Sequence, residues 1–148
     1  MRLVIGSDHA GWALKGAVVD HIQKLGHEVV DVGKVDRPVV VAPDIARAVA
    51  AMIVSGEVER GIMVCGTGVG ASIAANKMKG IRAAVCHDVH SAHQSVEHDD
   101  VNVMCIGAQI VGPWLAKDLI TAYLGATFST AEEFRRRVAK LAVMDSER

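Results

Sequence analysis

Short apolar runs alternate with longer segments of helical periodicity five times along this sequence, and this alternation restricts the fold more than any other feature. The runs have the length and composition of buried strands and lie at 3–6, 28–32, 61–65, 81–85 and 101–107. Helices are predicted at 12–25, 45–55, 70–79, 89–97 and 113–124, and a last basic helix, capped by Ser129 and Thr130, at 131–143. Strands that alternate with helices form parallel sheets covered on both faces. The sequence therefore predicts an α/β fold with one five-stranded parallel sheet, in which the run 3–6 is the central strand.

The composition excludes several classes of protein. The 148 residues suffice for one domain with a core, so we expect residues 1–148 to form a single domain. A formal net charge of −1 and 3% aromatic residues provide neither a basic face nor a stacking platform for nucleic acid. No apolar run reaches the roughly 20 residues of a membrane span, and the N-terminus enters a strand without a signal peptide. Cys65, Cys86 and Cys105 form no CxxC pair, which argues against a disulfide framework or a zinc site and predicts a cytoplasmic location.

The segment CGTGVG at 65–70 joins the third predicted strand to its helix and is the strongest candidate for a catalytic site. Three glycines allow a tight turn whose backbone N–H groups point into one small volume, with the positive end of the helix dipole behind them. This arrangement stabilises an oxyanion, and it also favours the thiolate of a cysteine at the strand's end. Cys65 is therefore a candidate base or nucleophile, whereas Cys86 and Cys105 lack such a turn and are expected to be structural.

Ligands of parallel α/β sheets bind beyond the carboxyl ends of the strands. At the first of these ends, Asp8 and His9 have the chemistry to hold a sugar hydroxyl and an anionic group, although an Asp here also commonly caps the following helix. His98 is a candidate acid–base group, although a single loop histidine is more often solvated. The other histidines near this end, His87, His90 and His93, lack the carboxylate pattern of a zinc site, so we expect no metal.

The glycine turn also has the form Gly66-x-Gly68-x-x-Ala71 of a dinucleotide-binding fingerprint, with Asp88 near the expected acidic position. That fingerprint belongs to the first βαβ unit of its fold, and a chain of this length leaves little room for a substrate domain. A small nucleotide-binding module is therefore an alternative of low weight, and we expect no nicotinamide cofactor.

Taken together, the motifs resemble the RpiB/LacA/LacB sugar-phosphate isomerase family, and within it the type B ribose-5-phosphate isomerases. The matching segments occur in order over nearly the whole chain: SDHAG at 7–11, DVG at 31–33, CGTGVG at 65–70, SIAANK at 72–77, GIRA at 80–83 and NV at 102–103 through Gly107. The resemblance implies a three-layer, Rossmann-like α/β/α sandwich with a C-terminal helix. It also implies a homodimer or homotetramer with active sites between subunits, and a cofactor-free interconversion of an aldose and a ketose through a cis-enediolate.

The family's site residues carry over to matching positions of this sequence. By resemblance, Cys65 is the base that moves a proton between C1 and C2, and Thr67 and His98 assist ring opening. Asp8 holds sugar hydroxyls, and the enediolate oxygen is bound by backbone N–H groups of the turn, which comprises Gly66, Thr67, Gly68, Val69 and Gly70. The resemblance implies ribose 5-phosphate as the aldose and ribulose 5-phosphate as the ketose.

The sequence departs from the family where a phosphate is expected to bind. Gln109 stands where the family usually has Arg, Asp99 replaces a common Asn, and Val41-Ala42-Pro43 replaces a segment with a tyrosine. The segment 131–134 replaces a Gly-Gly-Arg-His, so that Arg137 is the one familiar phosphate-binding arginine that clearly remains. Three alternatives stay open: substitute contacts from Arg135, Arg136 or Arg37, a different sugar phosphate, or an unphosphorylated sugar. A paralogue that binds sugar without turnover is a further alternative, against which the joint presence of Cys65, Thr67, Asp8 and His98 argues.

Overall fold

The computed structural model describes residues 1–33 and 40–148, so Arg37 lies outside the described residues. Five parallel strands form one sheet in the order β2-β1-β3-β5-β4. Their bounds are β1 Arg2–Ser7, β2 Glu28–Asp31, β3 Arg60–Cys65, β4 Ala83–Val85 and β5 Val103–Gly107. The predicted α/β class and five-stranded parallel sheet are confirmed. The placement of the first run as the central strand was wrong, because β3 occupies the middle of the sheet and β1 lies beside it.

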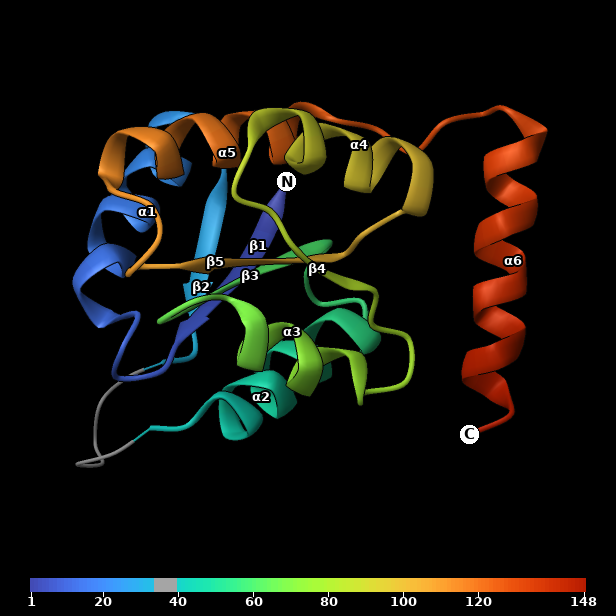
Figure 1. Cartoon of the computed structure of the whole chain (residues 1–148), viewed down its shortest axis with the longest axis horizontal. Helices are drawn as coiled ribbons and strands as arrows, with labels where there is room; N and C mark the ends of the chain where they lie inside the picture. The colour runs from blue at the N-terminus through green and yellow to red at the C-terminus, as the bar shows by residue number, and fades with distance from the viewer. Residues whose placement is uncertain (34–39) are drawn as a thin grey trace.

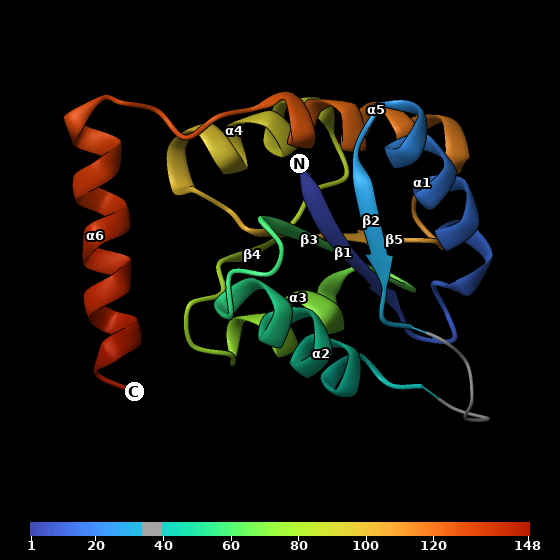
Figure 2. The same ribbon diagram turned by 180° about the vertical axis from the view of Figure 1, so that it is seen from behind.

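Helices cover both faces of this sheet, as Figures 1 and 2 show. One face carries α1 (Trp12–Lys24), α4 (Val89–Asp99) and α5 (Pro113–Gly125), and the other carries α2 (Ala42–Val54) and α3 (Val69–Asn76). The two apolar cores divide accordingly, since alternate residues of a strand face opposite sides. Ile5, Ile62 and Met104 pack under α1, α4 and α5, whereas Val4, Met63 and Cys105 pack under α2 and α3. The predicted three-layer sandwich is therefore present.

The edge strand β4 is shorter than predicted because two asparagine side chains hold the chain before it. The Asn76 amide donates to the carbonyl of Ala83 at 2.8 Å and accepts from its N–H at 2.9 Å, so it pairs with the free edge as a neighbouring strand does. Asn102 accepts from Arg82 N–H and donates to the Gly80 carbonyl, both at 2.8 Å. These side chains end α3 at Asn76, three residues before the predicted end, and start β5 at Val103.

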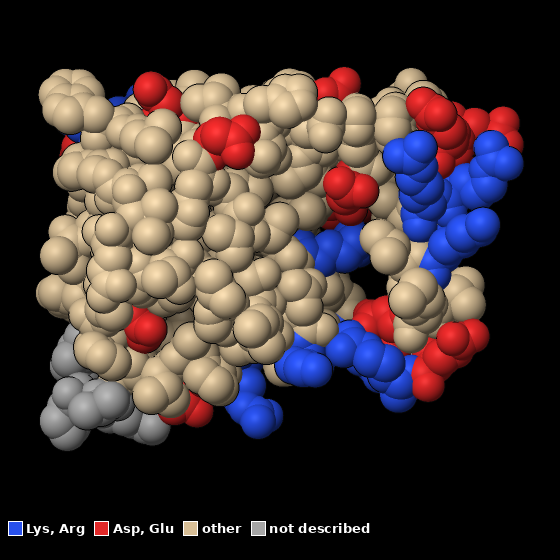
Figure 3. Space-filling model, viewed as in Figure 1, with Lys and Arg blue, Asp and Glu red and all other residues tan. Residues whose placement is uncertain are grey.

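The C-terminal helix α6 (Glu132–Ser146) stands apart from the sandwich, and none of its residues is buried. The predicted cap by Ser129 and Thr130 was wrong: Ala131 is the N-cap, no side chain caps the helix, and the Ser129 hydroxyl accepts from the Ala131 N–H instead. Side-chain contacts tie α6 to the body, among them Asp145 accepting from Gly80 N–H at 2.6 Å and Arg148 donating to Asn76 O at 2.9 Å. Basic side chains gather along this helix in Figure 3, and a hollow separates it from the body.

No helix within the described residues combines the length and the apolar character required to cross a membrane.

Candidate active site

Cys65 ends β3 in the middle of the sheet, and its side chain lies under the turn that leads into α3. The residue is 5% exposed, and its sulfur accepts a hydrogen bond from the Gly68 N–H at 2.9 Å. Gly68 has a φ of +82° and caps α3, a conformation that a side chain would strain. A backbone donor at a helix N-terminus thus points at the sulfur, and this arrangement stabilises a negative charge there.

The remaining residues of the turn lie near the surface around this sulfur. Thr67 is exposed, and its hydroxyl accepts from the Val69 N–H at 3.3 Å. Gly66 is half-buried, while Val69 and Gly70 open α3 and are exposed. The structure therefore gathers the predicted turn residues around Cys65, with the Gly68 and Val69 N–H groups bonded within the turn.

The end of β5 supports the turn from behind. Ala108 N–H donates to the Cys65 carbonyl at 2.8 Å, and Gln109 N–H donates to the Gly66 carbonyl at 2.9 Å. Gly107 packs so tightly that a Cβ there would lie 2.6 Å from Gly66 O and Thr67 Cα. In a trans peptide the C=O and N–H point in opposite directions. The fixed carbonyls of Cys65 and Gly66 therefore direct the following two N–H groups away from β5, toward the side on which β1 ends.

Asp8 and His9 follow β1 on that side. The Asp8 carboxylate accepts from the Gly11 N–H at 3.0 Å and so closes a local turn, while Gly11 itself is the N-cap of α1. The Gly11 Cα packs directly against the Val64 carbonyl, so that no Cβ fits there. His9 is exposed, and its Nδ1 lies 3.2 Å from Val40 O. The structure thus brings Asp8 and His9 to the same edge of the sheet as Cys65.

His98, Asp99 and Arg137 lie elsewhere. Because α4 connects two parallel strands, it runs back from the carboxyl edge to the amino edge, and His98 and Asp99 are at its end. The His98 ring stacks on the Phe134 ring of α6, with the ring centroids 3.9 Å apart. The Arg137 guanidinium lies over the same Phe134 ring, 5.3 Å from its centroid. The eleven residues of α4 span about 16 Å. Within one chain the structure therefore does not bring these three residues to Cys65.

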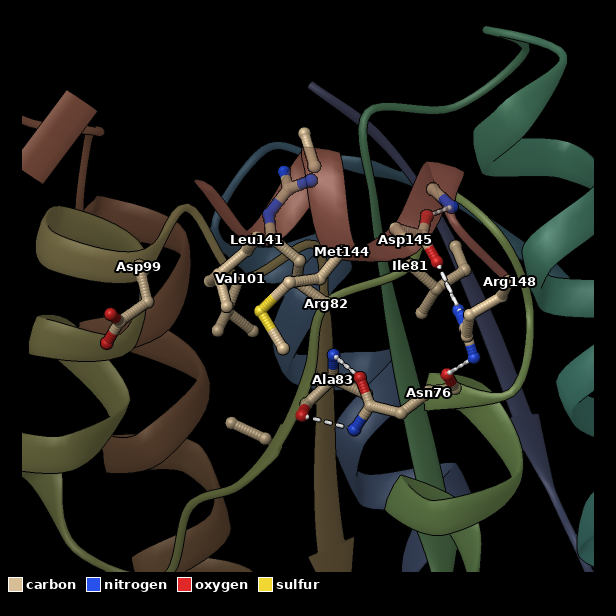
Figure 4. Close-up of a pocket in the computed structure, with 13 residues that line it drawn as sticks. Asn76, Ile81, Arg82, Ala83, Asp99, Val101, Leu141, Met144, Asp145 and Arg148 are labelled. Carbon is tan, nitrogen blue, oxygen red and sulfur yellow. Dashed lines mark hydrogen bonds and ion pairs between the residues drawn. The ribbon is translucent and has the colours of Figure 1, made fainter. Parts of the chain in front are cut away.

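A groove of about 630 Å³ runs between α6 and the β4 edge of the sheet. Asp99 lines one end of it, and Leu141 and Met144 of α6 point into it in Figure 4. The large apolar side chains of α6, Leu141, Val143 and Met144, are all exposed.

Comparison with known proteins gives a consistent result. A family model described as Ribose/Galactose Isomerase matches residues 3–141. The chain belongs to this family.

Its relatives match over almost their entire length. Ribose-5-phosphate isomerase B of Escherichia coli is 42% identical over 142 residues, which cover 96% of this chain and 95% of the relative. D-erythrulose-4-phosphate isomerase of Pectobacterium atrosepticum is 40% identical over 131 residues, covering 86% of this chain and 85% of the relative. The solved structure of Clostridium thermocellum ribose-5-phosphate isomerase B has a TM-score of 0.94 at 43% identity and covers 99% of both chains. The predicted family, fold and isomerase class are confirmed.

Two groups important for this isomerase's geometry were missed in the sequence. Lys15 is 5% exposed, and its Nζ contacts the Asp31 carboxylate at 2.9 Å and the Gly33 carbonyl at 3.1 Å. These contacts give the DVG motif at 31–33 a structural role, because they hold the end of β2 against α1. His87 accepts from the Gly107 N–H through Nε2 at 2.9 Å. The sequence gives no signal for these contacts, because Asp31 and Gly33 are distant in the chain from Lys15, and Gly107 is distant from His87.

The other two cysteines, which we expect to be structural, are buried even more completely than Cys65. Cys86 and Cys105 are 1% and 0% exposed, and burial raises the pKa of both thiols. Both therefore remain protonated at neutral pH.

Proposed function

We propose that residues 1–148 form one domain that interconverts an aldose phosphate and a ketose phosphate without a cofactor, with Cys65 as the base. The observation that carries this proposal is the Gly68 N–H donated to the Cys65 sulfur at the start of α3. The Cys65 thiolate removes the proton from C2 of the open-chain aldose, and the electrons move into the C1–C2 bond to give a cis-enediolate. The Cys65 thiol returns that proton to C1 while the proton of the C2 hydroxyl moves to O1, which gives the C2 carbonyl of the ketose and regenerates the thiolate.

Backbone donors beside the sulfur suit the negative charge that develops on the substrate oxygen. The Gly66 and Thr67 N–H groups are directed away from β5 by the bonds that Ala108 and Gln109 make to the preceding carbonyls. Donors held in place before the reaction contribute several kcal/mol to such a transition state, roughly 3–4 kcal/mol for a single one. On the same edge, we assign Asp8 to the sugar hydroxyls and His9 to an anionic group of the substrate.

The proposal includes a homodimer or homotetramer in which a second copy completes each site. His98, Asp99 and Arg137 are at the amino edge of the sheet and Cys65 is at the carboxyl edge, so one chain cannot bring them together. In a two-fold assembly the α4–α6 corner of one copy meets the Cys65 edge of the other. There His98 acts with Thr67 in ring opening, and Arg137 binds the phosphate. The exposed apolar side chains of α6, Leu141, Val143 and Met144, support this assembly.

Within this class, ribose 5-phosphate is the first candidate substrate, because the Escherichia coli relative is named for it. The relative from Pectobacterium atrosepticum, of nearly equal identity, is named for D-erythrulose 4-phosphate. Gln109 does not separate these two substrates, since its neutral amide lies beside Gly66 where a cation would attract the phosphate of either one. The alternatives of an unphosphorylated substrate and of sugar binding without turnover are distinguished by the experiment described next. We further propose a cytoplasmic location, consistent with three free cysteines.

The test is proton exchange at C2 in deuterated solvent, followed by NMR, with a panel of free and phosphorylated tetroses, pentoses and hexoses. We expect exchange with wild-type protein and with Cys86→Ala, and its loss by at least about 100-fold in Cys65→Ala. Cys86→Ala is the matched control, since Cys86 is equally buried at the end of the edge strand. Full exchange in Cys65→Ala would show that another residue is the base, and binding without exchange would identify a sugar-binding protein.

A further inference from the structure

His87 lies outside the predicted reaction, between the end of β4 and the start of α4. Its Nε2 accepts the Gly107 N–H at 2.9 Å, so the ring is neutral and carries its proton on Nδ1. Burial lowers the pKa of His87 below its ordinary value, while the neighbouring Asp88 carboxylate opposes this change. The neutral ring is thus the form that the fold holds at neutral pH.

The bond to His87 acts on the residue that supports the catalytic turn. Gly107 is packed against the backbone of Gly66 and Thr67. The next two residues donate to the carbonyls of Cys65 and Gly66 at 2.8 and 2.9 Å. Since these carbonyls determine where the following N–H groups point, any movement of Gly107 reorients the donors proposed for the enediolate oxygen.

We propose that His87 is a positioning residue for the isomerase reaction, and that its neutral imidazole fixes the β5 end against the Cys65 turn and makes turnover sensitive to acid. The inference rests on the proposed function, because it assigns a role to the donors of that site. Protonation of Nε2 replaces the acceptor with a second donor facing the Gly107 N–H. The two N–H groups repel each other, and Gly107 is released from its position.

The charges around the ring allow this titration to be isolated. Within the described residues, the charged group that acts on the His87 ring is the Asp88 carboxylate. As the N-cap of α4, it accepts from the Ser91 N–H at 2.7 Å. Cys86 precedes His87 in the chain, and Cys105 and Cys65 are the cysteines of the neighbouring strands β5 and β3. The raised pKa values of Cys86 and Cys105 keep these two thiols neutral throughout the acidic range.

His87→Gln is the informative variant, because its amide oxygen places an uncharged acceptor near the position of Nε2. We expect its kcat to equal the wild-type value at pH 8. Below the pKa of His87 the ratio of variant to wild-type kcat should rise by up to about tenfold per pH unit, with KM changed little. His87→Phe, which keeps a ring without an acceptor, should lower kcat by about tenfold or more at every pH. His90→Gln, on the exposed start of α4, is the control and should keep the wild-type profile. A constant kcat ratio across pH for His87→Gln would overturn the inference.

A second measurement is independent of activity. In the full-length protein without sugar, the amide resonance of Gly107 should shift with pH at the same midpoint as the His87 ring, and it should stay constant in His87→Gln. A Gly107 amide that is unchanged while the His87 ring titrates would also overturn the inference. Failure of the proposed function gives a different result: Cys65→Ala would be active, while the Gly107 amide would still titrate together with the His87 ring.

Discussion

Complementation between two inactive variants tests the placement of catalytic groups on opposite edges of the sheet. Cys65→Ala and His98→Asn each disable one of the two groups. If both groups of a site came from one chain, a dimer with one copy of each variant would have one lesion in each site. If each site combines Cys65 of one copy with His98 of the other, both lesions fall in the same site. The second site is then intact.

The structure sets the expected magnitude. Cys65 ends β3 at the carboxyl edge of the sheet and His98 lies near the amino-edge end of α4, a helix about 16 Å long, whereas proton transfer requires contact at about 3 Å. A single chain cannot close this distance, because α4 packs on the core through Ala92 and Val96, which are fully buried. Each homodimeric variant should lose about 100-fold or more of its activity, and the mixed dimer should recover about half of the wild-type kcat per dimer.

The assay uses co-expression of the two variants with different affinity tags, purification through both tags, and steady-state rates on the preferred sugar phosphate. His93→Asn is the matched control for His98→Asn: it lies on the same helix, is half exposed and pairs with Glu97 at 2.9 Å. It should be active by itself. A mixed dimer as inactive as its parents would refute the shared site, and a fully active His98→Asn homodimer would remove His98 from the site.

Two further predictions concern the turn and the thiols. Gly107→Ala places a Cβ 2.6 Å from the Thr67 backbone, so it should cost about 1–3 kcal/mol of stability and lower both Tm and kcat. The control is Gly16→Ala, which has open space around it in α1 and should raise Tm slightly. A Gly107→Ala variant with the wild-type Tm would contradict the packing of Gly107 against Thr67. Iodoacetamide at pH 8 should modify Cys65 before Cys86 and Cys105, because burial raises the pKa of these two thiols. Mass spectrometry of the peptides gives the order of modification, and protein unfolded in urea should react at all three cysteines. Modification of Cys105 before Cys65 would contradict this prediction.

Much of the fold was predictable because it follows from local patterns. The apolar runs predicted five parallel strands, and Gly66, Gly68 and Gly70 predicted the turn that the structure shows after β3. The strand order was not predictable in the same way. Which strand is central depends on where each helix crosses the sheet, and no run of residues encodes this directly. β1 and β3 are both short and apolar, so their placement could not be separated by composition.

Element ends were missed where side chains distant in the sequence decide them. Helical periodicity continues past Asn76, but the helix ends at this residue, whose side-chain amide donates to the Ala83 carbonyl on β4. The same limit applies to the site. Cys65 was identified from the turn beside it, whereas the bond from Gly107 to His87 joins residues twenty positions apart and becomes visible only in three dimensions.

The two parts of the proposed site differ in how freely they can change. The Cys65 turn is fixed by backbone contacts with Gly107, Ala108 and Gln109, so substitutions there disturb the proton transfer itself. His9, Asp99 and Gln109, which stand where the rest of a sugar phosphate is expected to bind, are exposed and belong to neither apolar core. We expect a fold built this way to keep the chemistry of an α-hydroxy carbonyl while its exposed residues select the sugar. Relatives named for a pentose phosphate and for a tetrose phosphate, at 42% and 40% identity to this chain, agree with that division.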